Sequence, residues 1–432
     1  MQRTLPDWLA YIEAQHPKSI DMGLKRVRVV AKRMGLEKPA RHVITVGGTN
    51  GKGSTVAFIE AIARAQGWKV GAYTSPHLLH YNERVRIDGQ DASDGALVQA
   101  FEAVEAARRR TPGDSLPLTY FEFGTLAALW LFARSELDLA ILEVGLGGRL
   151  DAVNIVDPEV AVITAVGLDH QDWLGDDREA IGFEKAGIAR AWKPLVLGED
   201  DPPASVLRHA YAIGASAIRG GSDFLVDPPE FGGDTWRWRE VGFEVDLPLP
   251  ALAAPVQLRN AATAIAALRA LDAPVDAEAM ARGVANARLP ARLQRFERNG
   301  VEVLVDVGHN PHAASALAQA LRATAHGGRT LAVYAALADK DHAGVVDVLA
   351  PQVHAWLLAG TEAAGARGFT AQALQARLSQ RAGSSAASGA TVHADVAAAL
   401  RAALAQAARG DRVLVFGSFH AAGEALQLLN KG

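Results

Sequence analysis

The fold of this chain is decided by the stretch Val43-Ile44-Thr45-Val46-Gly47-Gly48-Thr49-Asn50-Gly51-Lys52-Gly53-Ser54-Thr55. Its first four residues are of β type and mostly apolar, and a glycine-rich turn follows them. An apolar-periodic segment then runs from Val56 to Gln66 and stops at Gly67. This order predicts a strand, a phosphate-binding loop and a helix.

The composition of the loop suits an anion. Glycines let backbone N–H groups converge, and the start of the helix adds its partial positive charge. Lys52 can reach the β- and γ-phosphates of a nucleotide, and Ser54 or Thr55 can bind Mg²⁺. The predicted nucleotide-binding residues are Gly48, Thr49, Asn50, Gly51, Lys52, Gly53, Ser54 and Thr55. Gly53 separates Lys52 from the hydroxyls, which the general P-loop pattern does not have. The alternative, a turn that binds nothing, leaves the order of these residues unexplained.

Length and composition exclude several classes of protein. A chain of 432 residues exceeds what one core usually supports, so we expect two domains. There are no cysteines, which excludes disulfides and thiolate chemistry. The net charge is −4 and no long basic run occurs, so nucleic acid is not an expected partner. The start of the chain has no apolar signal core, and no stretch suits a membrane span. We therefore expect a cytoplasmic protein without membrane contact.

The order of predicted elements indicates an α/β protein. Further strands are expected at 69–74, 139–144 and 160–166, with helices near 94–110, 119–134 and 178–191. Apolar and polar residues alternate in parts of the segment 222–250, which predicts a small antiparallel excursion from the main sheet. A long Ala-rich helix is expected to begin at Arg259. Residues 380–391 are of low complexity and predict a flexible surface loop.

A break near Leu289-Pro290 separates two domains, which we place at residues 1–289 and 290–432. A second strand and helix series follows the break, with strands at 301–307, 331–334, 355–358 and 413–416. The predicted fold class is α/β with two domains. The first is a P-loop ATPase-type, mostly parallel sheet flanked by helices, and the second is a smaller Rossmann-like α/β domain. The active site is expected in the cleft between them.

Polar residues follow the carboxyl ends of several predicted strands, where open α/β sheets bind ligands. They are Ser75, Glu143 and His170 in the first domain and Asp306, His309 and Asn310 in the second. Glu143 ends an apolar strand, as expected of a carboxylate that holds Mg²⁺. Together Ser75, Glu143 and His170 make an acceptable ligand set for a second Mg²⁺ or Mn²⁺. A satisfied polar loop residue is the alternative for each taken alone.

Distinctive motifs are spread along nearly the whole chain. They are Ile20-Asp21-Met22-Gly23-Leu24, the loop at Gly48 to Thr55, Ser75-Pro76-His77-Leu78, Glu83-Arg84-Val85-Arg86, Tyr120-Phe121-Glu122-Phe123-Gly124-Thr125, Glu143-Val144-Gly145-Leu146-Gly147-Gly148-Arg149-Leu150-Asp151-Ala152, Asp169-His170, Glu184-Lys185-Ala186-Gly187-Ile188, Asp306-Val307-Gly308-His309-Asn310-Pro311-His312 and Gly417-Ser418-Phe419-His420. This set resembles the Mur ligase superfamily and, within it, the enzymes that add glutamate to dihydropteroate and to folates. The extra Gly53 is also a feature of this group.

The resemblance implies an ATP-dependent carboxylate–amine ligase. ATP would phosphorylate a carboxylate to an acyl phosphate, and the amine of L-glutamate would displace phosphate to form an amide. The carboxylate would belong to dihydropteroate or be the γ-carboxylate of a folate. These small molecules, ATP and Mg²⁺ at two sites are the expected partners of a monomeric enzyme.

The resemblance also implies roles for single residues. Lys52 would hold phosphate, Ser54 and Glu143 a first Mg²⁺, and Ser75, Glu143 and His170 a second. Lys185 matches a carbamylated lysine of the family, whereas its helical position alone would suit a surface ion pair. Nucleotide contacts are implied for Asn260, Arg292, Asp306 and His309, and substrate contacts for Phe121, Phe123, Asp151 and Ala152. The catalytic set would be Lys52, Glu143, His170, Lys185 and His309. Ala291 stands where the family pattern has glycine before Arg292.

Three alternatives remain open at this point. The enzyme could have only one of the two glutamate-adding activities. It could be a cell-wall amino-acid ligase of the same superfamily, although such ligases usually carry an additional domain. A nucleotide-dependent switch without ligase chemistry would not require Asp306, His309 and Asn310.

Overall fold

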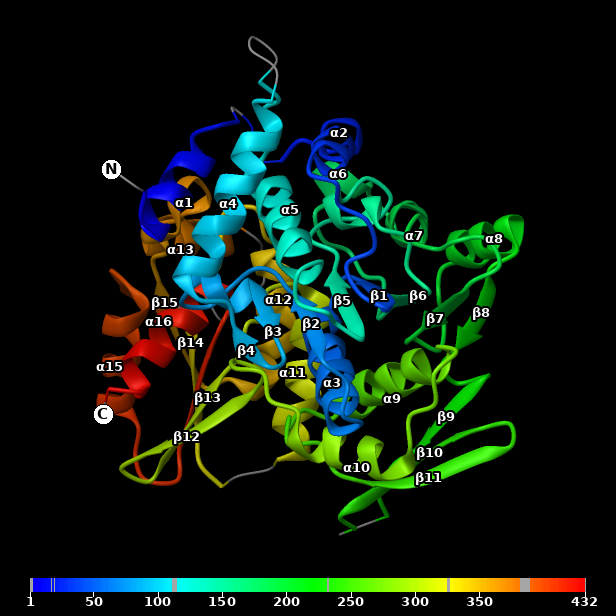
Figure 1. Ribbon diagram of the computed structural model, residues 1–432. Helices are drawn as coiled ribbons and strands as arrows, with labels where there is room; N and C mark the ends of the chain where they lie inside the picture. Colours follow the sequence, from blue (N-terminus) through cyan, green and yellow to red (C-terminus); the bar gives the residue numbers. More distant parts are fainter. Residues whose placement is uncertain are drawn as a thin grey trace. The chain divides into compact units, whose positions relative to one another are not determined.

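The computed structural model describes residues 3–16, 18, 20–110, 115–230, 233–324, 327–380 and 389–431 (Figure 1). It divides into two compact units. The first comprises residues 1–167, 172–251 and 258–287, and the second comprises 168–171, 252–257 and 288–432. The predicted two-domain α/β class is confirmed, whereas the boundary at 289/290 stays a prediction. Most of the predicted loop at 380–391, at residues 381–388, lies outside the described residues.

An eight-stranded sheet forms the centre of the first unit, in the order β4-β3-β2-β5-β1-β6-β7-β8. Strands β2, β5, β1, β6, β7 and β8 run parallel, and β3 and β4 are antiparallel additions at one edge. The strands are β1 His42–Gly47, β2 Val70–Tyr73, β3 Val85–Ile87, β4 Gln90–Asp91, β5 Leu139–Glu143, β6 Val160–Ile163, β7 Pro194–Leu197 and β8 Ser216–Arg219.

Helices flank this sheet, and side-chain caps fix the starts of several of them. Thr4 and Thr119 form capping boxes with Asp7 and Glu122, which satisfy the first free N–H groups of α1 and α5. Helices α1, α4 and α5 pack together around Trp8, Phe101 and Phe123 (Figure 1). The helices are α1 Leu5–Glu13, α2 Lys25–Arg33, α3 Lys52–Ala65, α4 Asp94–Arg108, α5 Tyr120–Phe132, α6 Gln171–Leu174, α7 Arg178–Ala186, α8 Ala204–Ile213, α9 Val256–Arg269 and α10 Ala277–Asn286, with 3₁₀ turns η1 Tyr81–Arg84 and η2 Ala152–Ile155.

The predicted antiparallel excursion is a separate three-stranded sheet in the order β11-β10-β9. Alternation along β10 buries Trp236 and Trp238 and exposes the residues between them. The Trp238 indole N–H donates to the Ala262 carbonyl in α9, which ties this sheet to the helix. Helix α10 packs against α3 (Figure 1). The strands are β9 Phe224–Asp227, β10 Thr235–Glu240 and β11 Phe243–Pro248.

The second unit contains a six-stranded sheet in the order β12-β13-β17-β14-β15-β16, in which only β12 is antiparallel to its neighbour. Tyr334, Trp356 and Phe416 pack in its core. Its strands are β12 Gln294–Arg298, β13 Val301–Val305, β14 Thr330–Tyr334, β15 Ala355–Ala359, β16 Thr391–His393 and β17 Arg412–Phe416. Its helices are α11 Pro311–Ala323, α12 His342–Leu349, α13 Ala371–Ser379, α15 Val396–Gln406 and α16 Phe419–Leu429, with 3₁₀ turns η3 Ala350–Gln352 and η4 Glu362–Arg367.

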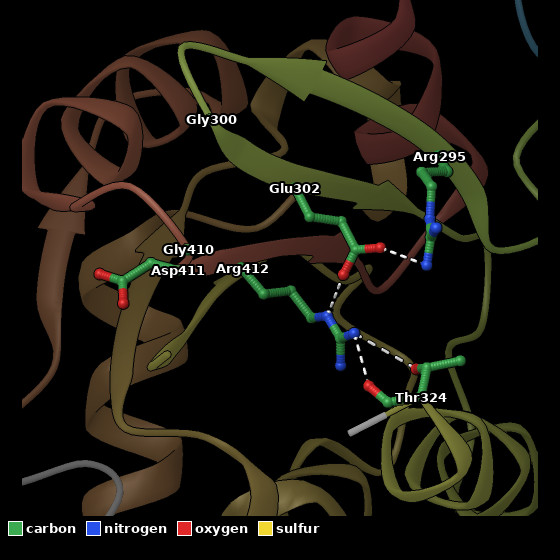
Figure 2. A pocket seen from close by; sticks show the side chains of 7 residues that line it. All are labelled: Arg295, Gly300, Glu302, Thr324, Gly410, Asp411 and Arg412. Carbon is green, nitrogen blue, oxygen red and sulfur yellow. Dashed lines mark hydrogen bonds and ion pairs between the residues drawn. The ribbon is translucent and has the colours of Figure 1, made fainter. Parts of the chain in front are cut away.

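A cavity of about 270 Å³ lies at the amino ends of β13 and β17 in the second unit. Figure 2 shows the buried Arg412 side chain reaching Glu302 and Thr324 there. Glu302 also pairs with Arg295. Asp411, which also lines the cavity, pairs with Arg329. These ion pairs form a structural network at the end of the sheet opposite the strand ends that carry Asp306.

Candidate active site

The phosphate-binding loop lies between β1 and α3, as predicted. Gly51 caps the helix with φ 89°, a left-handed conformation that favours glycine. Gly48 has φ 143°, and a Cβ at this position would lie 2.0 Å from Thr164 Oγ1. The loop backbone therefore needs glycine at both positions, which explains the glycine-rich sequence.

Two threonines hold the loop in shape. The Thr164 hydroxyl donates to the Asn50 carbonyl at 2.7 Å and also lies 3.2 Å from the Gly47 carbonyl. The Thr49 backbone N–H donates to the Ala165 carbonyl at 2.7 Å, and its hydroxyl accepts from the Gly167 N–H at 3.0 Å. The loop is therefore tied to the segment after β6. Sequence analysis missed Thr164, and the available signal was a hydroxyl directly after an apolar strand.

The loop side chains fit a phosphate ligand and a cation. Lys52 Nζ donates to the carbonyls of Gly48 and Thr49, at 2.9 and 3.2 Å, so the ammonium group lies over the loop. Ser54 and Thr55 are buried in the first turn of α3. Within the described part of the chain, Thr55 Oγ1 is a buried hydroxyl without a hydrogen-bond partner. Such groups usually indicate a missing partner, and a metal ion or its bound water would supply one.

Replacing Gly48 by alanine is expected to distort this loop. The new methyl group would overlap the Thr164 hydroxyl, and alanine is strained at φ 143°. We expect a loss of about 1–3 kcal/mol in unfolding free energy and weakened binding of MgATP, measured by calorimetry. Gly95→Ala is the control, because no atom lies within 4 Å of that Cβ position in α4. Equal behaviour of the two variants would contradict the prediction.

Glu143 ends β5, which lies between β2 and β1 in the sheet. It pairs in register with Val46 of β1, and its Oε2 accepts from the Ser75 N–H at 3.0 Å. The structure thus brings Ser75 and Glu143 together beside the strand that enters the phosphate loop. His170 belongs to the second unit, so its place in the predicted ligand set stays a prediction.

The arrangement around Glu143 suits magnesium held partly by a nucleotide. In the described ranges, no three His, Asp or Glu side chains gather into a group that could hold a metal. Mg²⁺ is commonly bound through one or two carboxylates together with substrate phosphates and waters. A single buried carboxylate, nearby hydroxyls and a phosphate loop are consistent with that mode of binding.

Lys185 lies in the last turn of α7 and is only 4% exposed. It therefore does not lie on the solvated helix face that a surface ion pair would need. The end of α7 is held by the Glu184 carbonyl, which accepts from the Arg149 N–H at 2.8 Å. A Cβ on Gly148 would lie 2.9 Å from the Lys185 carbonyl oxygen. The turn after β5 therefore requires glycine at position 148 in order to pack against the end of α7.

The predicted substrate residues occupy different environments. Asp151 is buried and accepts from the N–H groups of Gly145, Leu146 and Val153, so its carboxylate braces the turn after β5. Burial raises the pKa of Asp151 to about 6, against the opposing effect of these hydrogen bonds. Ala152 is buried in η2, and Phe123 is fully buried in the core. Phe121 is partly exposed and packs on Gly145. Substrate contacts of all four stay predictions.

Asn260 lies at the phosphate loop, since a Cβ on Gly51 would be 2.7 Å from its Oδ1. Helix α9 thus places the predicted nucleotide contact beside the loop within the first unit. In the second unit, the Arg292 guanidinium lies over the Phe419 ring, 5.4 Å from its centroid. Ala291 adopts φ 53° there, so the alanine takes the left-handed conformation that the expected glycine would favour.

The strand end after β13 carries Asp306 and His309. The Asp306 carboxylate accepts from the N–H groups of Leu293 and Gly308, at 2.8 and 2.7 Å. Burial raises the pKa of Asp306, although Arg292 acts in the opposite direction. His309 Nδ1 lies 3.0 Å from the Val307 carbonyl, and its Nε2 lies 3.3 Å from Asp169 Oδ2.

Asp169, for which sequence analysis named no role, is a centre of contacts in the second unit. Burial disfavours its charged form, but hydrogen bonding from His309 and the charge of Lys340 outweigh this and hold the pKa of Asp169 well below its usual range. Lys340 was missed altogether. The signal that could have indicated it is the charged run Asp339-Lys340-Asp341 shortly after the buried strand β14.

Glu199 makes the stability of the first unit depend on pH. Burial raises its pKa from 4.5 to about 7, against the opposing effect of Arg178. Between these values the folded chain binds more protons than the unfolded chain, so the free energy of unfolding falls as pH rises. We expect Glu199→Gln to remove about 1–3 kcal/mol of this fall, measured by urea unfolding at pH 5 and pH 8. An unchanged pH dependence in the variant would contradict this assignment.

Comparison with known proteins agrees with this geometry. The family model described as Mur ligase middle domain matches residues 46–268, and that described as Mur ligase, glutamate ligase domain matches 291–419. The dihydrofolate synthase/folylpolyglutamate synthase of Escherichia coli (strain K12) is 46% identical over 427 residues, covering 99% of this chain and 96% of that protein.

Two similar solved structures contain ligands. One is Escherichia coli FolC in complex with DHPP and ADP, with a TM-score of 0.91, 45% identity and coverage of 99% of this chain and 98% of that one. The other is a bifunctional folylpolyglutamate synthase/dihydrofolate synthase with Mn, AMPPNP and L-glutamate bound, with a TM-score of 0.89, 44% identity and the same coverage. Among the described residues, no helix has the length and apolar character of a membrane span.

The two family models and the high sequence identities show that the chain belongs to the Mur ligase family and, within it, to the dihydrofolate synthase/folylpolyglutamate synthases.

Proposed function

We propose that this protein is an ATP-dependent ligase that adds L-glutamate both to dihydropteroate and to the γ-carboxylate of folates. The observation that carries the proposal is the geometry at the first sheet, where Glu143 and Ser75 meet beside a phosphate loop shaped by Gly48 and Gly51. Family membership and 46% identity over nearly the whole chain support the choice of substrates.

The reaction has two steps. A substrate carboxylate oxygen attacks the γ-phosphorus of ATP, the bond to the β-phosphate oxygen breaks, and an acyl phosphate and ADP form. The amine of L-glutamate then attacks the acyl carbon, loses a proton and expels inorganic phosphate, which leaves an amide. No protein nucleophile is needed, so positioning and charge neutralisation account for most of the catalysis.

Residues of this chain would hold the nucleotide and the divalent cations. Lys52 and the loop N–H groups would bind the phosphates, Ser54 and Glu143 would hold one cation, and Ser75, Glu143 and His170 would hold a second. Asn260, Arg292, Asp306 and His309 would contact the nucleotide. Phe121, Phe123, Asp151 and Ala152 would form the substrate side. When bound, Mg²⁺ or Mn²⁺ supplies positive charge that offsets the repulsion between ATP and the attacking carboxylate.

We also propose that the enzyme works as a monomer, which light scattering would report as a mass of 45.6 kDa.

Lys185 is proposed to be carbamylated, because it is only 4% exposed and matches the position of a carbamylated lysine in the family. We expect Lys185→Arg, which keeps a cation, to lower the rate of phosphate release by about 100-fold, the size of one lost electrostatic contact. Lys185→Glu, which restores an anion, should retain more activity than Lys185→Arg. The reverse order, measured with matched protein concentrations, would show that a cation is required.

The first experiment measures phosphate release by the purified protein with MgATP and L-glutamate. One reaction contains dihydropteroate and the other tetrahydrofolate, and mass spectrometry follows the products. Release in both, with each product heavier by one glutamate, supports the proposal. Release in only one selects an enzyme with a single activity. Release in neither, while ATP still binds, overturns the choice of folate substrates and favours another acid of the superfamily, such as a cell-wall precursor.

A further inference from the structure

The Asp169 carboxylate is shared by four donors within the second unit. Oδ1 accepts from Lys340 Nζ at 2.7 Å and from the His170 backbone N–H at 2.9 Å. Oδ2 accepts from Asn310 Nδ2 at 3.0 Å and lies 3.3 Å from His309 Nε2. The Lys340 and Asp169 side chains are only 6% and 10% exposed.

These donors come from the ends of two strands that flank β17 and from the segment that carries His170. His309 and Asn310 follow β13, and Lys340 follows β14, on the two sides of β17 in the sheet. Asn310 is tightly placed, because its Oδ1 caps α11 by accepting from the Ala313 N–H at 2.9 Å while its Nδ2 reaches Asp169. Asp169 is therefore held against a helix start as well as against His309.

Lys340 is the charge that makes this arrangement possible. A buried carboxylate needs compensation, and Lys340 provides it at the shortest contact that Asp169 makes. A buried ion pair is weak evidence of a gain in stability, since well-packed apolar residues often serve a core equally well. What the pair does accomplish is to fix the carboxylate in one place, and with it the imidazole of His309 and the backbone at His170.

We propose that Lys340 is a positioning residue that acts through the Asp169 carboxylate to hold His309 and the His170 segment in the arrangement needed for glutamate ligation. This inference rests on the proposed ligase function and deepens it. Lys340 has no required contact with the substrates in this scheme. Its effect is expected chiefly on turnover and only weakly on nucleotide binding, because His309 is one of several proposed nucleotide contacts and the phosphate loop belongs to the first unit.

The test uses Lys340→Met, Asp169→Asn and the double variant in the full-length protein. The double variant removes both buried charges, so it keeps the test possible if Lys340→Met does not fold. The matched control is the double variant Arg412→Met/Glu302→Gln, which removes another buried ion pair of the same unit at the opposite edge of the sheet. For each protein we would measure kcat, KM for ATP, AMPPNP affinity and Tm, with activity assayed well below the lowest Tm.

We expect Lys340→Met to lower kcat by about 30- to 100-fold, within the range of one lost electrostatic contact, while KM for ATP and AMPPNP affinity change less than threefold. The double variant should recover Tm but have a kcat no lower than that of Asp169→Asn, because both residues act as one unit. The control pair should keep wild-type kcat.

Three results would overturn the inference. The first is a Lys340→Met kcat within threefold of wild type, and the second is a double variant whose kcat returns to wild type together with Tm. The third is additive loss of kcat in the double variant, which would mean that Lys340 acts independently of Asp169. Absence of phosphate release by the wild-type protein would instead overturn the proposed function, and the inference would fail with it.

Discussion

Replacing Glu143 by glutamine is expected to lower the rate of ATP-dependent phosphate release by about 10³-fold, the upper range for removing one group that stabilises charge in a transition state. Glu143 is 4% exposed, ends β5 and accepts from the Ser75 N–H. Glutamine can occupy the same space, but it loses the charge and replaces one acceptor oxygen with an NH2 group. The measurement is single-turnover phosphate release at saturating MgATP and L-glutamate with either folate substrate.

The control for this prediction is Glu159→Gln, which lies at the amino ends of the strands of the same sheet. Glu159 precedes β6 and pairs with Lys38 and His42, at the amino ends of the strands. It should keep activity within threefold, since ligands of open α/β sheets bind at the carboxyl ends. A Glu143→Gln enzyme as active as the Glu159→Gln enzyme would remove Glu143 from the proposed cation site.

Replacing Glu302 by alanine is expected to destabilise the second unit by about 3–5 kcal/mol, the cost of leaving a buried charge without its partner. Arg412 is 2% exposed, and its Nε donates to Glu302 Oε2 at 2.5 Å (Figure 2). Its Nη2 donates to the Thr324 carbonyl and hydroxyl, which carry no full charge. The Tm of the second unit should fall by roughly 10 °C in a calorimetric scan.

An exposed pair provides the comparison for Glu302. Arg237 and Asp246 pair on the antiparallel sheet at 2.7 Å with 44% and 60% of their side chains exposed. Because solvent screens such pairs, Asp246→Asn should leave the Tm nearly unchanged. If Glu302→Ala were as mild as Asp246→Asn, the Arg412 guanidinium would have to be hydrated through the adjacent cavity.

The strand, loop and helix around Lys52 were predictable because their signals are local. Backbone sterics require glycine at positions 48 and 51, where φ is 143° and 89°. Apolar residues recur every two residues in a strand and every 3.6 residues in a helix, so their spacing indicates which face of each element is buried. Glu143 and Ser75 were also predictable as neighbours, since parallel strands bring their carboxyl ends to one edge. The small antiparallel sheet was visible in the alternation of Trp236 and Trp238 with exposed residues.

The exact ends of helices and the environments of single side chains were harder to predict from the sequence. Helix α9 begins at Val256, before the predicted start at Arg259, and α7 ends at Ala186 instead of continuing to 191. Phe123, predicted from its motif to contact substrate, packs in the core against Trp8 and Phe101, and its substrate contact stays a prediction. A motif marks a stretch of chain, but burial of each side chain depends on which helix packs over it.

Local sequence signals were enough to predict two α/β domains, a phosphate loop at Lys52, and the strand ends that carry Ser75, Glu143, Asp306 and His309. Local sterics, hydrophobic period and strand polarity are sufficient for these features. Three further features became visible in the folded chain: Thr164 supports the loop, Lys185 is buried, and Asp169 contacts Lys340 across 171 positions of sequence. Such contacts depend on strand order and loop path, which no short-range pattern contains.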